Sequence, residues 1–152
     1  MKRIRTVPAP AITVHNSQRA VRVNLAELQA FAQRAVLQCL KLQHSTAQPF
    51  TGPGAINVVL VSDRKISLLH RRFLKINGPT DVITFQHGEV FMSTETARRN
   101  ARRFKSSNQR ELELYIVHGL LHLLGFEDDT PAGAREMERV QKKVLSAAEP
   151  TK

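Results

Sequence analysis

Residues 118–128 read His118-Gly119-Leu120-Leu121-His122-Leu123-Leu124-Gly125-Phe126-Glu127-Asp128. Two histidines lie four residues apart in an otherwise apolar run, and on a helix this spacing places them on one face, about 5–6 Å apart at Cβ. Both imidazoles can therefore bind one metal ion. Gly125 lets the helix end in a left-handed turn, because glycine has no Cβ to oppose that conformation. The reversed chain can then carry Asp128 to the same ion, so the pattern predicts a three-ligand metal site with room for water.

The alternative for this stretch is a buried helix whose histidines hydrogen-bond to backbone atoms. The helix around them is almost purely apolar, so two polar rings there need a strong partner. Carboxylates follow at once, at Glu127, Asp128 and Asp129. Ligand type and spacing favour the metal site. Asp129, one residue after Asp128, is an alternative third ligand.

Composition indicates one globular domain. The chain has 152 residues, of which 41% are hydrophobic, enough for a sizeable core. The single cysteine, Cys39, excludes an internal disulfide and fits a reducing compartment; its place in an apolar pattern predicts a core residue, not a nucleophile. No stretch approaches the roughly 18 apolar residues of a membrane span, and no hydrophobic signal core follows the basic N-terminus. We expect a soluble, cytoplasmic protein.

The charge balance favours a polyanionic partner. Lys and Arg number 23 against 13 Asp and Glu, a net charge of +10, which suits RNA or DNA, although a generally basic surface would give the same count. The basic residues concentrate in two places, Arg98, Arg99, Arg102 and Arg103 on one helix and Arg64, Lys65, Arg71, Arg72 and Lys75 on another. With one tyrosine and no tryptophan, we expect contacts to phosphate and shape, and no base-stacking platform.

Hydrophobic periodicity and turn residues predict the order of elements. Residues 1–10 are expected to be a flexible basic tail, residues 11–148 a single domain, and residues 43–54 a surface loop. Strands are predicted at 11–14, 56–61, 82–85 and 89–92, the last two forming an antiparallel hairpin. Helices are predicted to begin at Asn24, at Ser62 or Asp63, at Ser93, near residue 109 and at Thr130. This order predicts an α/β (α+β) fold, a small mixed β-sheet covered by helices.

Three motifs now carry a resemblance to a known family. The chain resembles the YbeY family of metal-dependent endoribonucleases, small bacterial and organellar proteins linked to ribosomal RNA processing. The family's H-G-x-L-H-L-x-G-[YF]-D-H corresponds to residues 118–128, its P-T-D-V-L-S-F to residues 79–85, and its G-D-I to residues 88–90. The similarity runs in the same order from about Ile12 to Leu145. It implies the family's fold, with a zincin-like metal helix.

The chain departs from the family pattern at three points. Asp128 stands where the family usually has a third histidine, and Leu74 stands where it usually has an arginine, six residues before Thr80. Gln86 and His87 nearly close a segment that is usually longer. A His₂-carboxylate site remains suitable for catalytic zinc. The extra negative charge should weaken the hold of the site on an electron-rich phosphate.

The resemblance implies a single-strand-directed, metal-dependent endoribonuclease. It implies action in ribosomal RNA maturation, at the 3′ end of 16S rRNA, and in ribosome quality control, with RNA and the small ribosomal subunit as partners. One zinc ion per chain would be held by His118, His122 and Asp128. The ion would lower the pKa of its bound water to about 7, and this water would hydrolyse the phosphodiester bond.

Further site residues are assigned on charge and position. Glu127 and Asp129 are candidates for leaving-group protonation, and Arg72 for a catalytic cation near Leu74. His87 is a further candidate acid, but an exposed turn histidine is the simpler interpretation. Basic residues would position the RNA backbone; the candidates are Arg71, Arg72, Lys75, Arg98 and Arg102.

Two other functions compete. A zinc metallopeptidase resembles this helix, but its chemistry uses H-E-x-x-H with the glutamate as general base, and here Gly119 follows His118. An RNA-associated or ribosome-associated factor with a structural metal is the second. Structural zinc usually has four protein ligands, and binding by Asp129 as well would favour that function.

Overall fold

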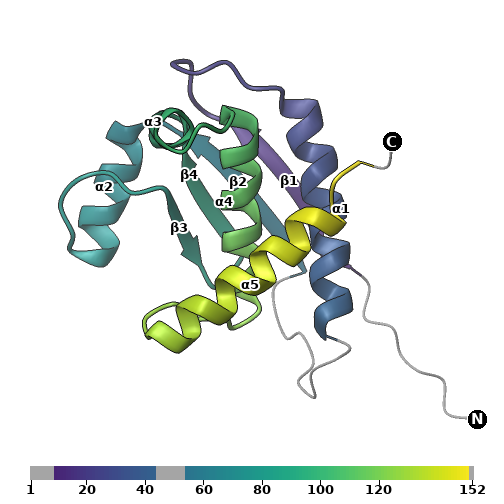
Figure 1. Ribbon diagram of the computed structural model, residues 1–152. Coiled ribbons are helices and arrows are strands. Elements are labelled where there is room, and N and C mark those ends of the chain that lie inside the picture. Colours follow the sequence, from purple (N-terminus) through teal and green to yellow (C-terminus); the bar gives the residue numbers. More distant parts are fainter. Residues whose placement is uncertain (1–8, 44–53, 151–152) are drawn as a thin grey trace, which may run out of the picture.

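The computed structural model describes residues 9–43 and 54–150. Within these residues the chain forms four strands and five helices, shown in Figure 1: β1 (Ala11–Asn16), α1 (Leu25–Gln43), β2 (Ala55–Val61), α2 (Asp63–Leu74), β3 (Val82–Phe85), β4 (Glu89–Ser93), α3 (Thr94–Arg103), α4 (Asn108–Leu123) and α5 (Pro131–Ala147). This is the predicted order, and the α+β fold with a small mixed sheet is confirmed. Most of the predicted tail and of the predicted 43–54 loop lies outside the described residues.

Hydroxyl side chains fix where the helices begin. Ser62 accepts a hydrogen bond from the Lys65 amide and so is the N-cap of α2, which leaves Asp63 as the first residue of that helix. Ser107 accepts from the amide of Arg110, and α4 therefore starts at Asn108, slightly earlier than predicted. Each cap satisfies an amide that has no partner inside its helix.

The sheet has the strand order β1-β2-β4-β3. β1 is parallel to β2 and β2 to β4, whereas β3 is antiparallel to β4 and forms one edge. The predicted hairpin is thus confirmed: the Gly88 amide donates to the Phe85 carbonyl at 2.9 Å, and Gly88 has a φ of 111°. Only glycine adopts that conformation without strain. The hairpin brings Thr84 of β3 opposite Val90 of β4.

Strand alternation divides the core into two parts. Val58, Leu60, Val90 and Met92 belong to a large core with α1, α4 and α5. On the opposite face, Val61, Ile83 and Ile66 of α2 form a smaller core, against which Phe85 and Phe91 pack. In Figure 1, α4 crosses in front of the sheet with α5 lying across it, and α2 lies to one side. Because α4 contacts α1, α3, α5, β3 and β4, its position is fixed from several directions.

The described helices are short or amphipathic. Among residues 9–43 and 54–150, no helix has the length and apolar character needed to cross a bilayer.

Candidate metal centre

The end of α4 forms a tight reversal that returns the chain to the histidines. Gly125 has a φ of 97°, its amide donates to the His122 carbonyl at 3.0 Å, and the Phe126 amide donates to the Leu121 carbonyl at 3.0 Å. This is the Schellman arrangement, which satisfies the last carbonyls of a helix. The predicted left-handed turn is therefore present, and residues 126–128 run back along α4.

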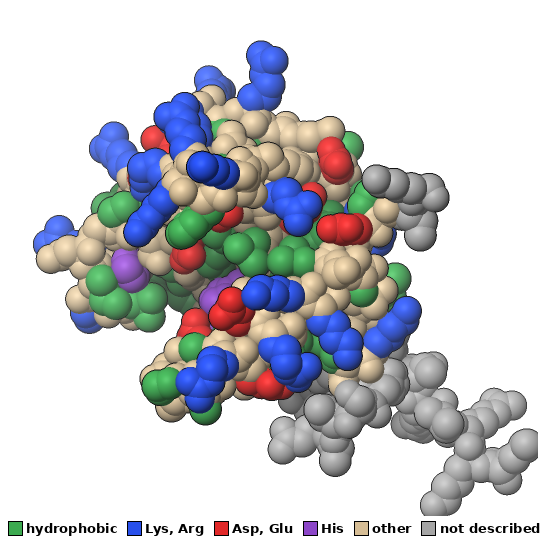
Figure 2. Space-filling view, viewed as in Figure 1, with side chains coloured by type: hydrophobic (Ala, Val, Ile, Leu, Met, Phe, Trp, Pro, Cys, Tyr) green, Lys and Arg blue, Asp and Glu red, His purple; other side chains and the backbone are tan. Residues whose placement is uncertain are grey.

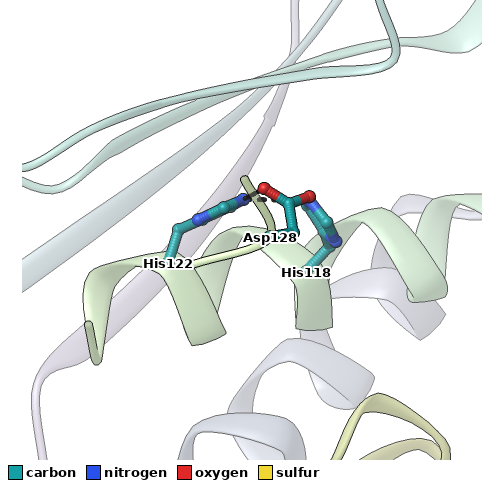
Figure 3. Close-up of side chains that lie close together, drawn as sticks. All are labelled: His118, His122 and Asp128. Atoms are coloured by element: carbon teal, nitrogen blue, oxygen red, sulfur yellow. Dashed lines mark hydrogen bonds and ion pairs between the residues drawn. The ribbon is translucent and has the colours of Figure 1, made fainter. Parts of the chain in front are cut away.

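Three side chains converge at this reversal, as Figure 3 shows. The Nε2 atoms of His118 and His122 are 3.0 Å apart. The Asp128 carboxylate lies 3.6 Å from Nε2 of His118 and 3.9 Å from Nε2 of His122. A tetrahedral zinc ion with bonds of about 2.0–2.2 Å separates its ligand atoms by roughly 3.3–3.6 Å. Among the described residues, this is the cluster whose ligand atoms suit one metal ion.

The far nitrogen of each ring has its own acceptor. His118 Nδ1 lies 2.6 Å from Oε1 of Gln141, and His122 Nδ1 lies 3.0 Å from the Phe126 carbonyl. When each Nδ1–H donates to its acceptor, both Nε2 lone pairs face the same point, and they repel unless a cation lies between them. Acceptors of this kind also orient zinc-binding imidazoles and raise their basicity. The residues present therefore fit a zinc ion.

Asp128, not Asp129, joins the two histidines. In the described part of the chain, the ligand cluster contains no oxygen of Asp129 or Glu127. Both of these side chains are exposed, one on each side of Asp128 in the sequence. If these three side chains bound a zinc ion, they would leave one coordination position free, as in catalytic zinc sites. The roles of Glu127 and Asp129 in proton transfer stay predictions.

A cleft opens beside the metal ligands along the edge strand. Its volume is about 420 Å³, and its lining consists of Phe73, Leu74, Val82, Ile83, Thr84, Phe85, Gln86 and His122. We call it the β3 cleft. Leu74 thus lies on the same cleft as His122, at the position where the family usually has arginine. Figure 2 shows a hollow in the middle of this face, with histidine at its margin.

The basic residues of α2 line a neighbouring groove. Arg71, Arg72 and Lys75 border a space of about 650 Å³ with Lys65, Leu68, Leu69 and Asn77. None of these cations lines the β3 cleft, although the Arg72 guanidinium lies 5.5 Å from the centre of the Phe73 ring, which does. A direct catalytic role for Arg72 therefore stays a prediction.

Arginines of α3 form a second basic surface. Figure 2 shows Lys and Arg side chains gathered over α3 and the adjoining part of α2. Arg99 is paired with Asp63 at 2.6 Å, whereas Arg98 and Arg102 make no ion pair within residues 9–43 and 54–150. The two predicted RNA contacts on this helix thus keep a charge that no ion pair of the described residues neutralises, and Arg103, which lies over the Phe104 ring, does so as well.

Gly119 explains why no glutamate follows His118. A Cβ built on Gly119 would lie 2.7 Å from Cγ1 of Val90 and 3.4 Å from Oγ1 of Thr84. The helix backbone approaches the sheet so closely here that no side chain fits without movement. A general base at this position, as in H-E-x-x-H peptidases, would point into the sheet and not toward the ligands.

The sequence did not predict that Gln141 contacts His118 or that Phe73 lines the β3 cleft. Gln141 lies on α5 between the buried residues Met137 and Val144, and a lone polar side chain on such an inner face was a usable signal. No local pattern in the sequence indicated that Phe73 and His122 line the same cleft.

Cys39 is buried as expected, and burial raises the pKa of its thiol to about 12, so it is neutral and unreactive near pH 7.

Comparisons with known proteins identify a family for this chain. The family described as Endoribonuclease YbeY matches residues 13–149. The Endoribonuclease YbeY of Frankia alni is 32% identical over 157 aligned positions, which cover 90% of this chain and 82% of that protein. The one from Moorella thermoacetica is 33% identical, covering 67% of this chain and 78% of that protein.

A solved structure supports the architecture. The solution structure of a protein from Thermotoga maritima superposes with a TM-score of 0.58 at 24% identity, covering 90% of this chain and 88% of the other. The shared fold, the family match along nearly the whole sequence and the relative that is 32% identical over 90% of it lead to one conclusion: the chain belongs to the YbeY family of endoribonucleases.

Proposed function

We propose that this protein is a zinc-dependent endoribonuclease that acts on single-stranded RNA. The observation that carries the proposal is the convergence of His118 Nε2, His122 Nε2 and the Asp128 carboxylate, with both Nδ1 atoms held by acceptors. A bound zinc ion supplies Lewis acidity, which lowers the pKa of water and polarises phosphoryl oxygens. The family membership supports RNA as the substrate.

The chain's own residues would bind and orient the substrate. Arg71, Arg72 and Lys75 on α2, with Arg98 and Arg102 on α3, would attract the phosphates, since cations on a surface steer a polyanion toward it. Asp128 adds a negative charge beside the scissile phosphate, which favours release of the anionic product over tight binding. Glu127 and Asp129 lie next to the ligand in sequence and would donate a proton to the leaving oxygen.

The cellular setting is proposed from the family resemblance. We propose a cytoplasmic role in maturation of the 3′ end of 16S rRNA and in ribosome quality control, with the small ribosomal subunit as the partner. A deletion strain should accumulate 16S rRNA with an unprocessed 3′ end, and mapping the 3′ ends by adaptor ligation and sequencing would test this setting separately from the chemistry.

The test of the proposed chemistry compares wild type with Asp128→Ala and, as the matched control, Asp129→Ala. We expect roughly one zinc ion per chain in wild type and RNA cleavage that depends on it. Asp128→Ala should lose both zinc and cleavage, while Asp129→Ala should keep the zinc. Elemental analysis and a labelled single-stranded RNA measure the two properties on one preparation.

The same preparation separates the competing function. A structural-metal factor would hold zinc and bind RNA but cut none, even with small ribosomal subunits supplied. Retention of RNA binding by His118→Ala, together with loss of cleavage, would instead support the nuclease. A peptidase is disfavoured by the contact between Gly119 and Val90, which leaves no place for the required glutamate.

A further inference from the structure

Phe73 is a large apolar side chain that the fold leaves half exposed beside the metal ligands. It is 52% exposed, at the C-terminal end of α2, and its neighbour Leu74 is 51% exposed. Both line the β3 cleft together with His122. Adjacent exposed apolar side chains in a cleft are typical of a surface that binds a ligand.

Other aromatic rings hold Phe73 in place from one side. Its ring meets Phe85 edge to face, with centroids 5.2 Å apart and an interplanar angle of 78°. Phe85 in turn contacts Phe91 at 5.8 Å and lies nearly parallel to His87 at 5.7 Å. Phe85 and Phe91 pack on the small core beneath α2. The Phe73 ring is therefore supported at its edge by a fixed cluster while half of its surface stays open.

The surroundings of the ring suit a nucleotide. No carboxylate is among the described residues that line the β3 cleft, and Gln86 supplies an amide that can hydrogen-bond to the edge of a base. Arg71, Arg72 and Lys75 border the groove on the other side of α2, where the backbone phosphates of the same strand would lie.

From these contacts we infer that Phe73 is a stacking platform for one unpaired nucleobase next to the bond that is cut. The inference rests on the proposed function and adds its specificity-determining residue. A flat base with polar edges fits an aromatic ring, an amide and flanking cations. Phe73 would thus provide a stacking surface, although the low content of tyrosine and tryptophan had led us to expect none.

The experiment is a double-mutant cycle between ring and base. Binding to the zinc-supplied full chain is measured for a short 2′-O-methyl oligonucleotide and for a matched oligonucleotide in which all nucleotides are abasic. Base–aromatic stacking is worth enough that Phe73→Ala should bind the base-bearing strand about fivefold or more weakly. Its binding to the abasic strand should not change. Phe73→Trp should retain the preference for bases and Phe73→Leu should lose it.

Phe104 provides the matched control. It is 64% exposed, and Arg103 lies 5.4 Å from its ring centre, much as Arg72 lies over Phe73. It follows α3, near the start of α4, while His122 lies at the far end of α4, roughly 21 Å along the axis at 1.5 Å per residue. Phe104→Ala should leave binding of both strands unchanged.

The outcomes separate this inference from the proposed function. Equal loss on both strands, or equal loss with Phe104→Ala, overturns the stacking role while wild-type cleavage leaves the nuclease intact. Unchanged binding of both strands by Phe73→Ala also overturns it. If Phe73→Ala weakens binding of the base-bearing strand alone but the wild type cuts no RNA, the stacking role of Phe73 stands and the proposed nuclease activity is overturned. Circular dichroism of each variant verifies that α2 still folds.

Discussion

His118 and His122 are oriented by different kinds of acceptor. His122 Nδ1 lies 3.0 Å from the Phe126 carbonyl, which the Schellman turn holds only four residues away. His118 Nδ1 instead depends on Gln141 of α5, at 2.6 Å and 23 residues distant. The first orientation is thus built into the end of α4, whereas the second requires that α5 be docked.

Removal of the Gln141 acceptor should weaken the metal site. Gln141→Leu leaves the ring of His118 free to rotate. We expect zinc affinity to fall about 10–100-fold, as when other residues that hydrogen-bond to a metal-binding histidine are removed. Gln141→Glu keeps an oxygen acceptor and should retain affinity. Competition with a chromophoric chelator measures both; equal affinities for wild type and the leucine variant would contradict a positioning role.

Close packing at Gly119 should make even a methyl group costly. The added Cβ of Gly119→Ala would meet Cγ1 of buried Val90 at 2.7 Å, and we expect a loss of about 1–3 kcal/mol in the free energy of unfolding. Urea denaturation measures this. Val90→Ala removes the clash, so the double variant should be less destabilised than the sum of the single variants. Additive losses would place the strain elsewhere.

At the scale of elements, Asp63 joins the starts of α2 and α3. Its carboxylate accepts hydrogen bonds from Ser93 Oγ at 2.6 Å, Thr96 Oγ1 at 2.7 Å and Arg99 Nη1 at 2.6 Å. Burial by itself would raise the pKa of Asp63, but the hydrogen bonds and the charge of Arg99 outweigh it and lower the pKa below its usual range. The ionised carboxylate therefore stabilises the contact between the two helices.

The Asp63 contact should be lost in acid. Because the folded-state pKa is lowered, the stabilisation is fully present above the unfolded pKa of about 3.9 and disappears as the pH falls through the folded value. Asp63→Asn should cost about 1–2 kcal/mol at pH 7, in line with hydrogen bonds to charged groups. The difference from wild type should vanish at low pH.

An exposed ion pair serves as the control for Asp63. Glu136 and Arg139 pair on the surface of α5 at 2.6 Å, and Glu136→Gln should change the stability little at any pH. Urea denaturation as a function of pH measures both variants. A pH-independent cost for Asp63→Asn would contradict the electrostatic account.

At the scale of the whole molecule, the net charge is +10, and the basic side chains differ in whether an acidic side chain pairs with them. On α5, Arg139 pairs with Glu136 and Lys142 with Glu138. On α3, Arg98 and Arg102 are not paired in this way in the described part of the chain. The basic surface over α2 and α3 should therefore dominate RNA binding.

Salt dependence of RNA binding should reveal that difference. Each lost phosphate contact lowers the slope of log K against log salt by about 0.7 for a single strand. We expect Arg98→Ala with Arg102→Ala to reduce the slope, whereas Arg139→Ala with Lys142→Ala, the same change in net charge, should leave it nearly unaltered. Equal reductions would mean that net charge alone governs binding. Fluorescence anisotropy at several salt concentrations provides the slopes.

The sequence by itself determined the features that depend on neighbouring residues. Helix caps such as Ser93 and Thr130, the reversal at Gly125 and the common face of His118 and His122 all follow from spacings of a few residues, where local backbone geometry decides. The family motifs and the order of elements were readable for the same reason.

Tertiary structure alone decided which distant groups meet. The choice of Asp128 over Asp129 depends on the path of the chain after the turn, and the acceptor for His118 on the docking of α5. The position of Phe73 beside His122 requires α2 and α4 to approach β3 from different sides. Contacts across dozens of residues depend on the packing of whole elements, which no local pattern specifies.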